Sequence, residues 1–473
     1  MATKKDLVEA HAFSRRRLVT AFVSGAPGGR EVEPVRPGRV LIGGIALSVL
    51  LLAGAAIAGF LLGRPPAQWL EAGSFIISKD TGEQYVVMRG GDDPQLQRVP
   101  NFVSAQLLLQ QAELTPFTVR DKYIRTVQLG EDLGIEGAPA TLPSAGELVD
   151  DGWTACTGAG VGIKVAIQQQ PTVEDLTGSA FLVSSGGEQW LIATAPAEGS
   201  EPGRAYRFPM PKDATSASTI GNKLGFSATP IEVEEEWLNL FPLRGALERS
   251  SFGVDDVDAP VPYADTGTDL SSYRVGDLLL SSSGAYYLLG DEAPERLDDF
   301  AGMLYDVVGS PAIPFDGDLR AQFGLTNYPD EWPSDLPTAV DGALCGVLHP
   351  ASGADPAVTL ATNPTGAADP AEVQAGRHDV DVEPSAGAYV LSGSDASADG
   401  GSPYVIDTKG EKYALGPAVP DYIGYADVEP PLVPSTWLEF FSSGVTLSTN
   451  SARRVPEDAP PPADSEPEAD TGS

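Results

Sequence analysis

Two cysteines and three histidines are the residues of this 473-residue chain best suited to redox or metal chemistry. Cys156 and Cys345 are 189 positions apart, and each lies beside strand-like sequence. They could form a disulfide bond, or they could stay as two buried free thiols. If they pair, the remaining His11, His349 and His378 cannot complete a zinc site of Cys and His ligands. We interpret His349 as a surface or strand-end histidine.

Other patterns that carry catalysis are missing from the sequence. None of the nine lysines follows a glycine, so the Gly-Lys-[Ser/Thr] of a Walker A loop does not occur. A Gly-x-Ser-x-Gly nucleophile elbow is also missing. The acidic runs at 255–258 and 316–318 lack EF-hand spacing, and we interpret them as solvated loops with at most weak affinity for Ca²⁺. The sequence therefore predicts no catalytic, cofactor-binding or metal-binding residues.

The elements around these residues come from an acidic chain that is rich in turn-forming residues. It has 66 Asp and Glu against 30 Lys and Arg, a formal net charge of −36, which argues against binding to a nucleic-acid backbone. Its 52 Gly and 41 Pro argue against an all-helical bundle, because both residues destabilise helix interiors. We therefore expect a β-rich α+β fold.

Residues 40–63 (VLIGGIALSVLLLAGAAIAGFLLG) form a run of 24 residues without an ionisable group. A helix of that length would be about 36 Å long, enough to cross a hydrocarbon core of about 30 Å, so we predict a single transmembrane helix. Residues 1–39 carry a net charge of +4 and the remainder −40. This bias predicts a cytoplasmic N-terminus and an extracytoplasmic body. Disulfides persist outside the cytoplasm, which favours a bond between the two cysteines over free thiols.

The predicted cytoplasmic arm, residues 1–39, contains an amphipathic helix in residues 4–25, followed by a linker rich in Gly and Pro. Leu18 and Phe22 lie near one face of this helix, and Arg15, Arg16 and Arg17 lie on the other side. These five residues are the predicted contact surface of the arm. Such a helix can lie on anionic lipid or dock into a groove of a partner, and the arginines could instead serve only to set the topology.

Four stretches of the body share one pattern, in which a Gly-containing turn precedes an aromatic residue and apolar residues. This pattern predicts the turn and second strand of a β-hairpin. After the first and third hairpins, Asn or Asp is a candidate helix N-cap. After the second and fourth, Trp-Leu-x-x-Phe predicts a short helix. The predicted core residues of these units are Tyr85, Trp190, Tyr287, Tyr413, Trp237 and Trp437.

The recurrence predicts four hairpin-plus-helix repeats of two alternating kinds. One unit is too small to bury much core alone, so we expect the units to pack against their neighbours. The predicted boundaries are residues 74–140, 178–250, 262–329 and 385–454.

The N-terminal pattern AHAFSRRRLVTAFVSG, followed by a linker and a long apolar span that ends in GRPP, resembles the EccB family. These proteins are membrane components of actinobacterial type VII secretion systems. The resemblance covers nearly the whole chain and implies repeats arrayed around a central β domain. That domain would use the remaining sequence, residues 141–177 and 330–384, and a bond between Cys156 and Cys345 would tie its halves together. Residues 380–391 resemble a Val-x-Pro-Gly-x-Gly-Ala stretch of the family, with Ser385 in place of the first Gly.

The resemblance implies a structural and assembly subunit of a type VII secretion complex in the cytoplasmic membrane. The implied partners are the lipid bilayer, an EccC-type motor ATPase, the EccD and EccE membrane components, and further copies of the chain, as dimers within a hexameric assembly. Residues 455–473 are Pro-rich and acidic, which predicts a disordered tail. Two other functions remain open. One is an extracytoplasmic nucleotide hydrolase, since some members of the family are described as ATPases. The other is a cell-wall-binding module that uses exposed Trp237 and Trp437.

Overall fold

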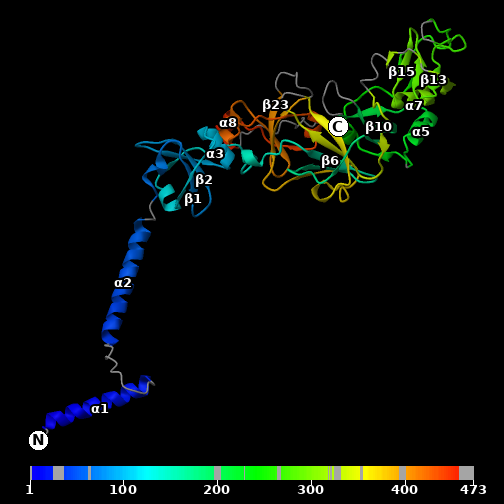
Figure 1. Cartoon of the computed structure of the whole chain (residues 1–473). Helices are drawn as coiled ribbons and strands as arrows, with labels where there is room; N and C mark the ends of the chain where they lie inside the picture. The colour runs from blue at the N-terminus through cyan, green and yellow to red at the C-terminus, as the bar shows by residue number, and fades with distance from the viewer. Residues whose placement is uncertain are drawn as a thin grey trace, which may run out of the picture. The chain divides into compact units, whose positions relative to one another are not determined.

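The computed structural model describes residues 3–24, 37–61, 65–195, 204–227, 229–263, 268–317, 319, 322–323, 332–351, 355–393 and 401–456 (Figure 1). Within these residues the chain divides into two units, Met1–Pro66 and Ala67–Ser473. Residues 25–36 of the predicted linker at 25–38, and residues 457–473 of the predicted tail, lie outside the described residues.

The first unit consists of two helices, α1 (Lys4–Ser24) and α2 (Pro37–Leu61). The carboxylate of Asp6 accepts hydrogen bonds from the backbone N–H and the hydroxyl of Thr3, at 3.0 and 2.8 Å, which fixes the first turn of α1. Helix α2 covers most of the apolar run at 40–63. Among the residues that the structure describes, none of the helices is both long and apolar enough to cross a membrane.

The second unit contains four repeat sheets with the same strand order. Each has a three-stranded antiparallel meander, with a short parallel strand beside the first strand and another beside the third. In the second repeat sheet a single parallel bridge between Arg207 and Leu243 takes the place of the last short strand, and β18 pairs with β9 as well. The meanders form where β-branched and aromatic residues alternate between glycine-containing turns.

The first repeat sheet consists of β1 (Phe75–Ser78), β2 (Gln84–Arg89), β3 (Gln95–Val99), β4 (Pro116–Val119) and β5 (Gln128–Leu129). The second consists of β9 (Ser179–Ser185), β10 (Glu188–Ala195), β11 (Arg204–Pro209), β12 (Ile231–Glu232) and β18 (Thr338–Ala339). The third consists of β13 (Leu278–Ser281), β14 (Tyr286–Leu289), β15 (Pro294–Leu297), β16 (Ile313–Phe315) and β17 (Gln322–Phe323). The fourth consists of β22 (Ala388–Ser392), β23 (Ser402–Ile406), β24 (Glu411–Ala414), β25 (Leu432–Val433) and β26 (Ser442–Ser443).

A helix follows the third meander strand in every repeat sheet. These helices are α3 (Phe102–Leu109), α5 (Ala214–Lys223), α7 (Asp299–Val308) and α8 (Val419–Ile423). Asn101, Asp213 and Asp298 cap the first three, because each side chain accepts a hydrogen bond from a backbone N–H in the first turn.

A second, four-residue helix follows the parallel strand in three of the repeats. These short helices are α4 (Asp121–Ile124), α6 (Glu235–Leu238) and α9 (Ser435–Leu438), and they place Tyr123, Trp237 and Trp437 at equivalent positions. The unit also contains α10 (Thr449–Ala452) and four short 3₁₀ helices, η1 (Ala67–Leu70), η2 (Ala145–Glu147), η3 (Arg249–Phe252) and η4 (Gly366–Ala368).

The second and first repeats therefore both contain two kinds of helix, and the predicted alternation of repeat types is wrong. The capped helix and the Trp-containing helix are successive elements of one unit, as Asp213 on α5 and Trp237 on α6 show. The fourth predicted hairpin is present as β23 and β24. The turn at Gly410 joins β23 to β24, the second and third meander strands, and the first strand is β22.

The central sheet has the order β21-β7-β6-β19-β20-β8. Its first three strands along the chain are β6 (Trp153–Thr157), β7 (Ile163–Ile167) and β8 (Glu174–Leu176). The other three, β19 (Leu344–His349), β20 (Ala357–Thr362) and β21 (His378–Val382), follow after the second and third repeat sheets. The central sheet is therefore discontinuous in sequence. The exact limits of the repeats and of this domain stay a prediction.

The repeat sheets have two apolar faces, and their helix-covered faces pack in pairs. Helix α5 contacts α7, and the second and third repeats share one buried cluster that includes Ile220 and Leu304. Helix α3 contacts α8, and the first and fourth repeats share another cluster that includes Val103 and Val419. The other faces of the second and fourth sheets pack on the central sheet, and in the first sheet Trp69 of η1 covers this face.

Candidate functional site

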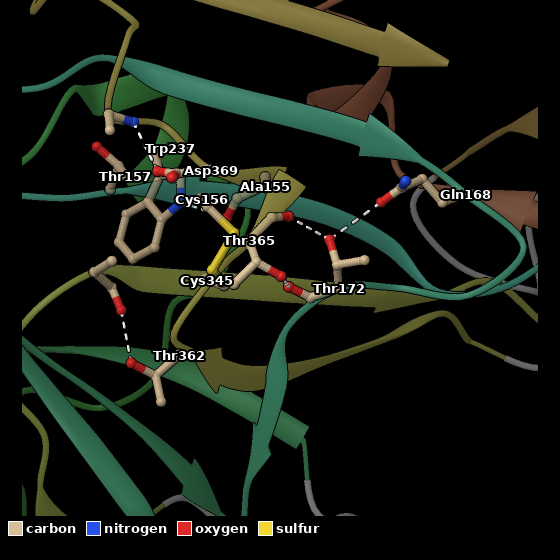
Figure 2. Close-up of a disulfide and its surroundings, with 12 residues drawn as sticks. Ala155, Cys156, Thr157, Gln168, Thr172, Trp237, Cys345, Thr362, Thr365 and Asp369 are labelled. Atoms are coloured by element: carbon tan, nitrogen blue, oxygen red, sulfur yellow. Dashed lines mark hydrogen bonds between the residues drawn. A yellow bond between two sulfur atoms is a disulfide. The ribbon is translucent and has the colours of Figure 1, made fainter. Parts of the chain in front are cut away.

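The central sheet is held together by a disulfide bond between Cys156 on β6 and Cys345 on β19, and both side chains are fully buried (Figure 2). The two residues lie directly opposite each other in the strand register, with their Cα atoms 4.1 Å apart. The bond joins two parts of the chain that are 189 residues apart. The predicted disulfide is thereby confirmed.

A loop and the helix η4 close over the disulfide. The backbone N–H of Thr365 donates to the carbonyl oxygen of Thr172 at 2.9 Å, and the hydroxyl of Thr172 donates to the carbonyl oxygen of Thr365 at 2.5 Å (Figure 2). Ala368 of η4 packs in the same buried cluster as the two cysteines. Exchange of a disulfide needs access by a thiolate, so we assign this bond a structural role.

Trp237 joins the second repeat to the strand that carries Cys156. Its side chain is fully buried, and its indole N–H donates to the carbonyl oxygen of Ala155 at 2.9 Å (Figure 2). The ring of Phe241 packs edge-to-face on Trp237, with 5.0 Å between ring centroids. Aromatic pairs of this geometry add stabilisation beyond the area that they bury.

Trp437 occupies the equivalent position in the fourth repeat. It is fully buried in the same cluster, beside Phe441, whose ring packs edge-to-face on Trp153 at 5.8 Å. Within the described part of the chain, the indole nitrogen of Trp437 has no hydrogen-bond partner. Trp237 and Trp437 therefore anchor two repeats to one sheet. The cell-wall-binding hypothesis required these two side chains to be exposed, and their burial removes its support.

The other predicted core residues lie on the meanders. Tyr85, Tyr287 and Tyr413 are buried, whereas Trp190 is only half-buried. The hydroxyl of Tyr85 donates to the carboxylate of Glu83 at 2.6 Å, and burial raises the pKa of Tyr85 to about 12. Burial likewise raises the pKa of Tyr413 well above its ordinary value. Tyr85 and Tyr413 are therefore packing residues that stay protonated at neutral pH.

The predicted contact residues of the arm all lie exposed on α1. Leu18 is 69% exposed and Phe22 93% exposed, and Arg15, Arg16 and Arg17 are exposed as well. Phe22 would cost free energy if it stayed in water, which agrees with a contact to lipid or protein. The contact itself stays a prediction.

His349, at the end of β19, forms the most catalysis-like arrangement. Its ring nitrogens lie 2.8 Å from the carboxylate of Asp151 and 3.0 Å from the hydroxyl of Thr359, beside a cavity of about 350 Å³. The side chain of Asp151 is 64% exposed, so water screens the electrostatic interaction between its carboxylate and the imidazole. The nearby N–H of Gly152 already donates to the carbonyl oxygen of Leu348 at 3.1 Å. We interpret these bonds as ties between strand ends.

His378 packs on the ring of Phe440, with 5.7 Å between ring centroids. Among the residues that the structure describes, no group of three or more His, Cys, Asp or Glu is arranged to hold a metal ion.

Helix α4 is a feature that the sequence patterns did not indicate. It is the first repeat's copy of the short helix, but Tyr123 and Val127 replace the Trp of the other copies and the Phe four residues after it. Its position after a parallel strand is the signal that identifies it. Arg120, Lys122 and Arg125 make this copy basic.

Comparison with known proteins links the fold to protein secretion. The family described as "Type VII secretion system ESX-1, transport TM domain B" matches residues 1–461. The chain is 31% identical over 205 residues to the "ESX-1 secretion system ATPase EccB1" of Mycobacterium tuberculosis (strain CDC 1551 / Oshkosh), a match over 41% of either chain. The matched region thus spans about two fifths of that relative.

Two solved structures share the fold. A chain of the intact ESX-5 inner membrane complex superposes with a TM-score of 0.58 at 21% identity, over 100% of this chain and 98% of that chain. A chain of the EccB3 dimer from the ESX-3 core complex superposes with a TM-score of 0.59 at 19% identity, over 80% of this chain and 100% of that chain.

Proposed function

Since the chain belongs to the EccB family, whose members are components of the type VII secretion inner membrane complex, we propose that it is a structural and assembly subunit of such a complex. The observation that carries this proposal is the extent of the family match, residues 1–461 of 473. In this role the protein binds and positions other subunits and supports export without chemistry of its own.

The proposal includes a single-pass anchor. Residues 40–63 would cross the cytoplasmic membrane, with residues 1–39 in the cytoplasm and the repeats outside. The apolar run of 24 residues and the excess of Lys and Arg before it support this topology. The buried disulfide supports it too, because such bonds persist in extracytoplasmic compartments.

The arm is proposed to contact lipid or the cytoplasmic and membrane subunits, namely an EccC-type motor ATPase, EccD and EccE. The exposure of Leu18 and Phe22 beside three arginines supports this role. The repeats would carry self-association, as dimers within a hexameric assembly. A solved relative is described as a dimer, which supports the first step.

Nucleotide hydrolysis is the second candidate function, and the printed name of the M. tuberculosis relative favours it. The sequence has no Gly-Lys-[Ser/Thr] to hold phosphates, and the strongly acidic body would repel a nucleotide. Measurement of ATP turnover after each step of purification distinguishes the two candidate functions. ATP turnover that stays constant per mole of this chain would favour the hydrolase, and turnover that falls with each step would favour the assembly role.

Co-purification tests the assembly role. Tagged full-length protein, extracted in mild detergent, should bring with it a multi-spanning membrane protein and an FtsK-like ATPase in fixed ratios. The triple variant Arg15→Ala/Arg16→Ala/Arg17→Ala should lose part of this yield if the arm contributes, while Lys409→Ala, on the body, should not. Recovery of the chain alone under these conditions would overturn the proposal.

A further inference from the structure

We propose that the first repeat binds anionic lipid headgroups at the outer face of the membrane through an α4 surface formed by Arg120, Lys122, Tyr123, Arg125 and Leu129. This inference rests on the membrane anchorage proposed above. It assigns to the body a second, weaker membrane contact, separate from the helix that would anchor it.

The α4 surface is basic and open to solvent. Arg120 and Lys122 are exposed, and the side chain of Arg125 is 80% exposed. Residues 116–129 contain three basic residues and one acidic residue, Asp121, in a body with a net charge of −40. The carboxylate of Asp121 accepts a hydrogen bond from the hydroxyl of Ser78 and lies 3.7 Å from the guanidinium of Arg125. The local charge is therefore the reverse of that of the body.

The other copies of the short helix do not share this charge. In α6 the positions of Arg120 and Lys122 hold Glu234 and Glu236, and in α9 they hold Pro434 and Thr436. The position of Arg125 holds Asn239 in α6 and Glu439 in α9. A feature that the repeat fold required would recur in all three copies. The basic residues therefore serve something that only the first repeat meets.

The aromatic position differs in the same way. Trp237 and Trp437 are fully buried against the central sheet, whereas Tyr123 is only half-buried, with the amino group of Lys122 4.7 Å from its ring centre. Leu129, on the following strand, is 57% exposed. The first repeat thus leaves partly open a position that the second and fourth repeats bury completely. Tyrosine beside basic residues is the composition that proteins place at membrane interfaces.

The covalent chain limits how far this surface can be from a membrane. Trp69 of η1 and Ile124 of α4 belong to one buried cluster, so the first residues of the body pack close to α4. Six peptide links join Leu61, the last residue of α2, to Ala67, the first residue of the body, and they reach at most about 21 Å. Lipid charge acts on basic side chains within roughly one Debye length, about 8 Å at physiological salt. Under the proposed anchorage, the chain therefore allows the first repeat to approach the bilayer closely enough for this attraction.

Hydrogen exchange of the full-length protein in lipid vesicles tests the inference. The protein is reconstituted in vesicles of phosphatidylglycerol and phosphatidylcholine, or of phosphatidylcholine alone. Amides of residues 116–129 should exchange about threefold or more slowly in the anionic vesicles, an advantage that 1 M salt removes. The variant Arg120→Gln/Lys122→Gln/Arg125→Gln should abolish the difference. The control Lys409→Gln/Arg453→Gln/Arg454→Gln, with the same charge change on exposed side chains of the fourth repeat, should keep it.

Vesicle flotation at 1 M salt separates this inference from the anchorage on which it rests. Protein that does not float would overturn the anchorage, whereas protein that floats with equal exchange in both vesicles would overturn only the lipid contact. A photo-reactive benzoylphenylalanine in place of Tyr123, in native membranes, identifies the neighbour directly. Crosslinks to phospholipid are expected, and crosslinks only to another protein would overturn the proposal in favour of a protein partner.

Discussion

Replacement of Trp237 by Phe measures how firmly the second repeat is attached to the central sheet. The change removes the indole N–H that donates to the carbonyl oxygen of Ala155 at 2.9 Å and shrinks a fully buried ring. The equivalent change, Trp437→Phe, shrinks an equally buried ring whose N–H has no hydrogen-bond partner among the described residues. Because the ring change is the same, the difference between the two variants reports the loss of the Trp237 hydrogen bond together with the removal of the unpaired N–H of Trp437.

A buried hydrogen bond contributes about 0.5–1.5 kcal/mol net, so Trp237→Phe should destabilise the protein by at least that much more than Trp437→Phe. We expect amides of β6, residues 153–157, to exchange about twofold to tenfold faster in Trp237→Phe than in Trp437→Phe, as 1.4 kcal/mol corresponds to a factor of ten. Guanidinium unfolding of the full chain, followed by tryptophan fluorescence and circular dichroism, gives the global comparison. Equal losses in the two variants, or a larger loss in Trp437→Phe, would refute the assigned role of the Ala155 bond.

Three further results are expected. The double variant Cys156→Ser/Cys345→Ser should lose about 2–5 kcal/mol of unfolding free energy in guanidinium. Reductant should lower the unfolding free energy of the wild type but not that of the variant. Asn101→Ala should lower the thermal midpoint, at a cost of about 1–2 kcal/mol, because it removes a buried N-cap that accepts a hydrogen bond from the N–H of Ser104 at 2.8 Å. A midpoint unchanged within 1 °C would argue against the cap. Burial raises the pKa of Glu295 from 4.5 to about 7, so the folded state holds a proton that the unfolded state releases between these values, and stability falls as the pH rises. With partial solvation this amounts to roughly 1–2 kcal/mol, and Glu295→Gln should flatten the decline in thermal unfolding between pH 5 and pH 8, whereas a variant as pH-sensitive as the wild type would contradict it.

The sequence predicted best those features that depend on short-range patterns. The helix over the apolar run, the turns at Gly82, Gly187 and Gly284, and the Trp-containing helices all appear at the expected positions. These features depend on glycine at positive φ, on capping groups and on apolar runs, all of which are specified by residues close together in the sequence. The disulfide followed from the count of cysteines and the predicted compartment.

Features that depend on long-range pairing were misjudged. The third meander strand and the short parallel strands are two to six residues long, which is too short for an alternating apolar pattern to identify them. The turn pattern at Gly410 indicated the hairpin of β23 and β24 but not β22, the first strand of that meander. Trp237 and Trp437 were predicted as core residues, but the central sheet that buries them could not be inferred, since its strands come from elsewhere in the chain.

The discontinuity of the central sheet also determines when, during synthesis of the chain, the sheet can be completed. Leu176 ends β8 and Leu344 begins β19, so 167 residues are synthesised between the two halves of the sheet. At roughly 5–20 residues per second, this takes about 8–33 seconds, and Cys345, 189 residues after Cys156, is synthesised about 9–38 seconds after it. The chain contains no third cysteine, so no wrong intramolecular pair can form in that interval. The scarcity of cysteine thus lets a late oxidation step close the correct bond without an isomerase to rearrange it.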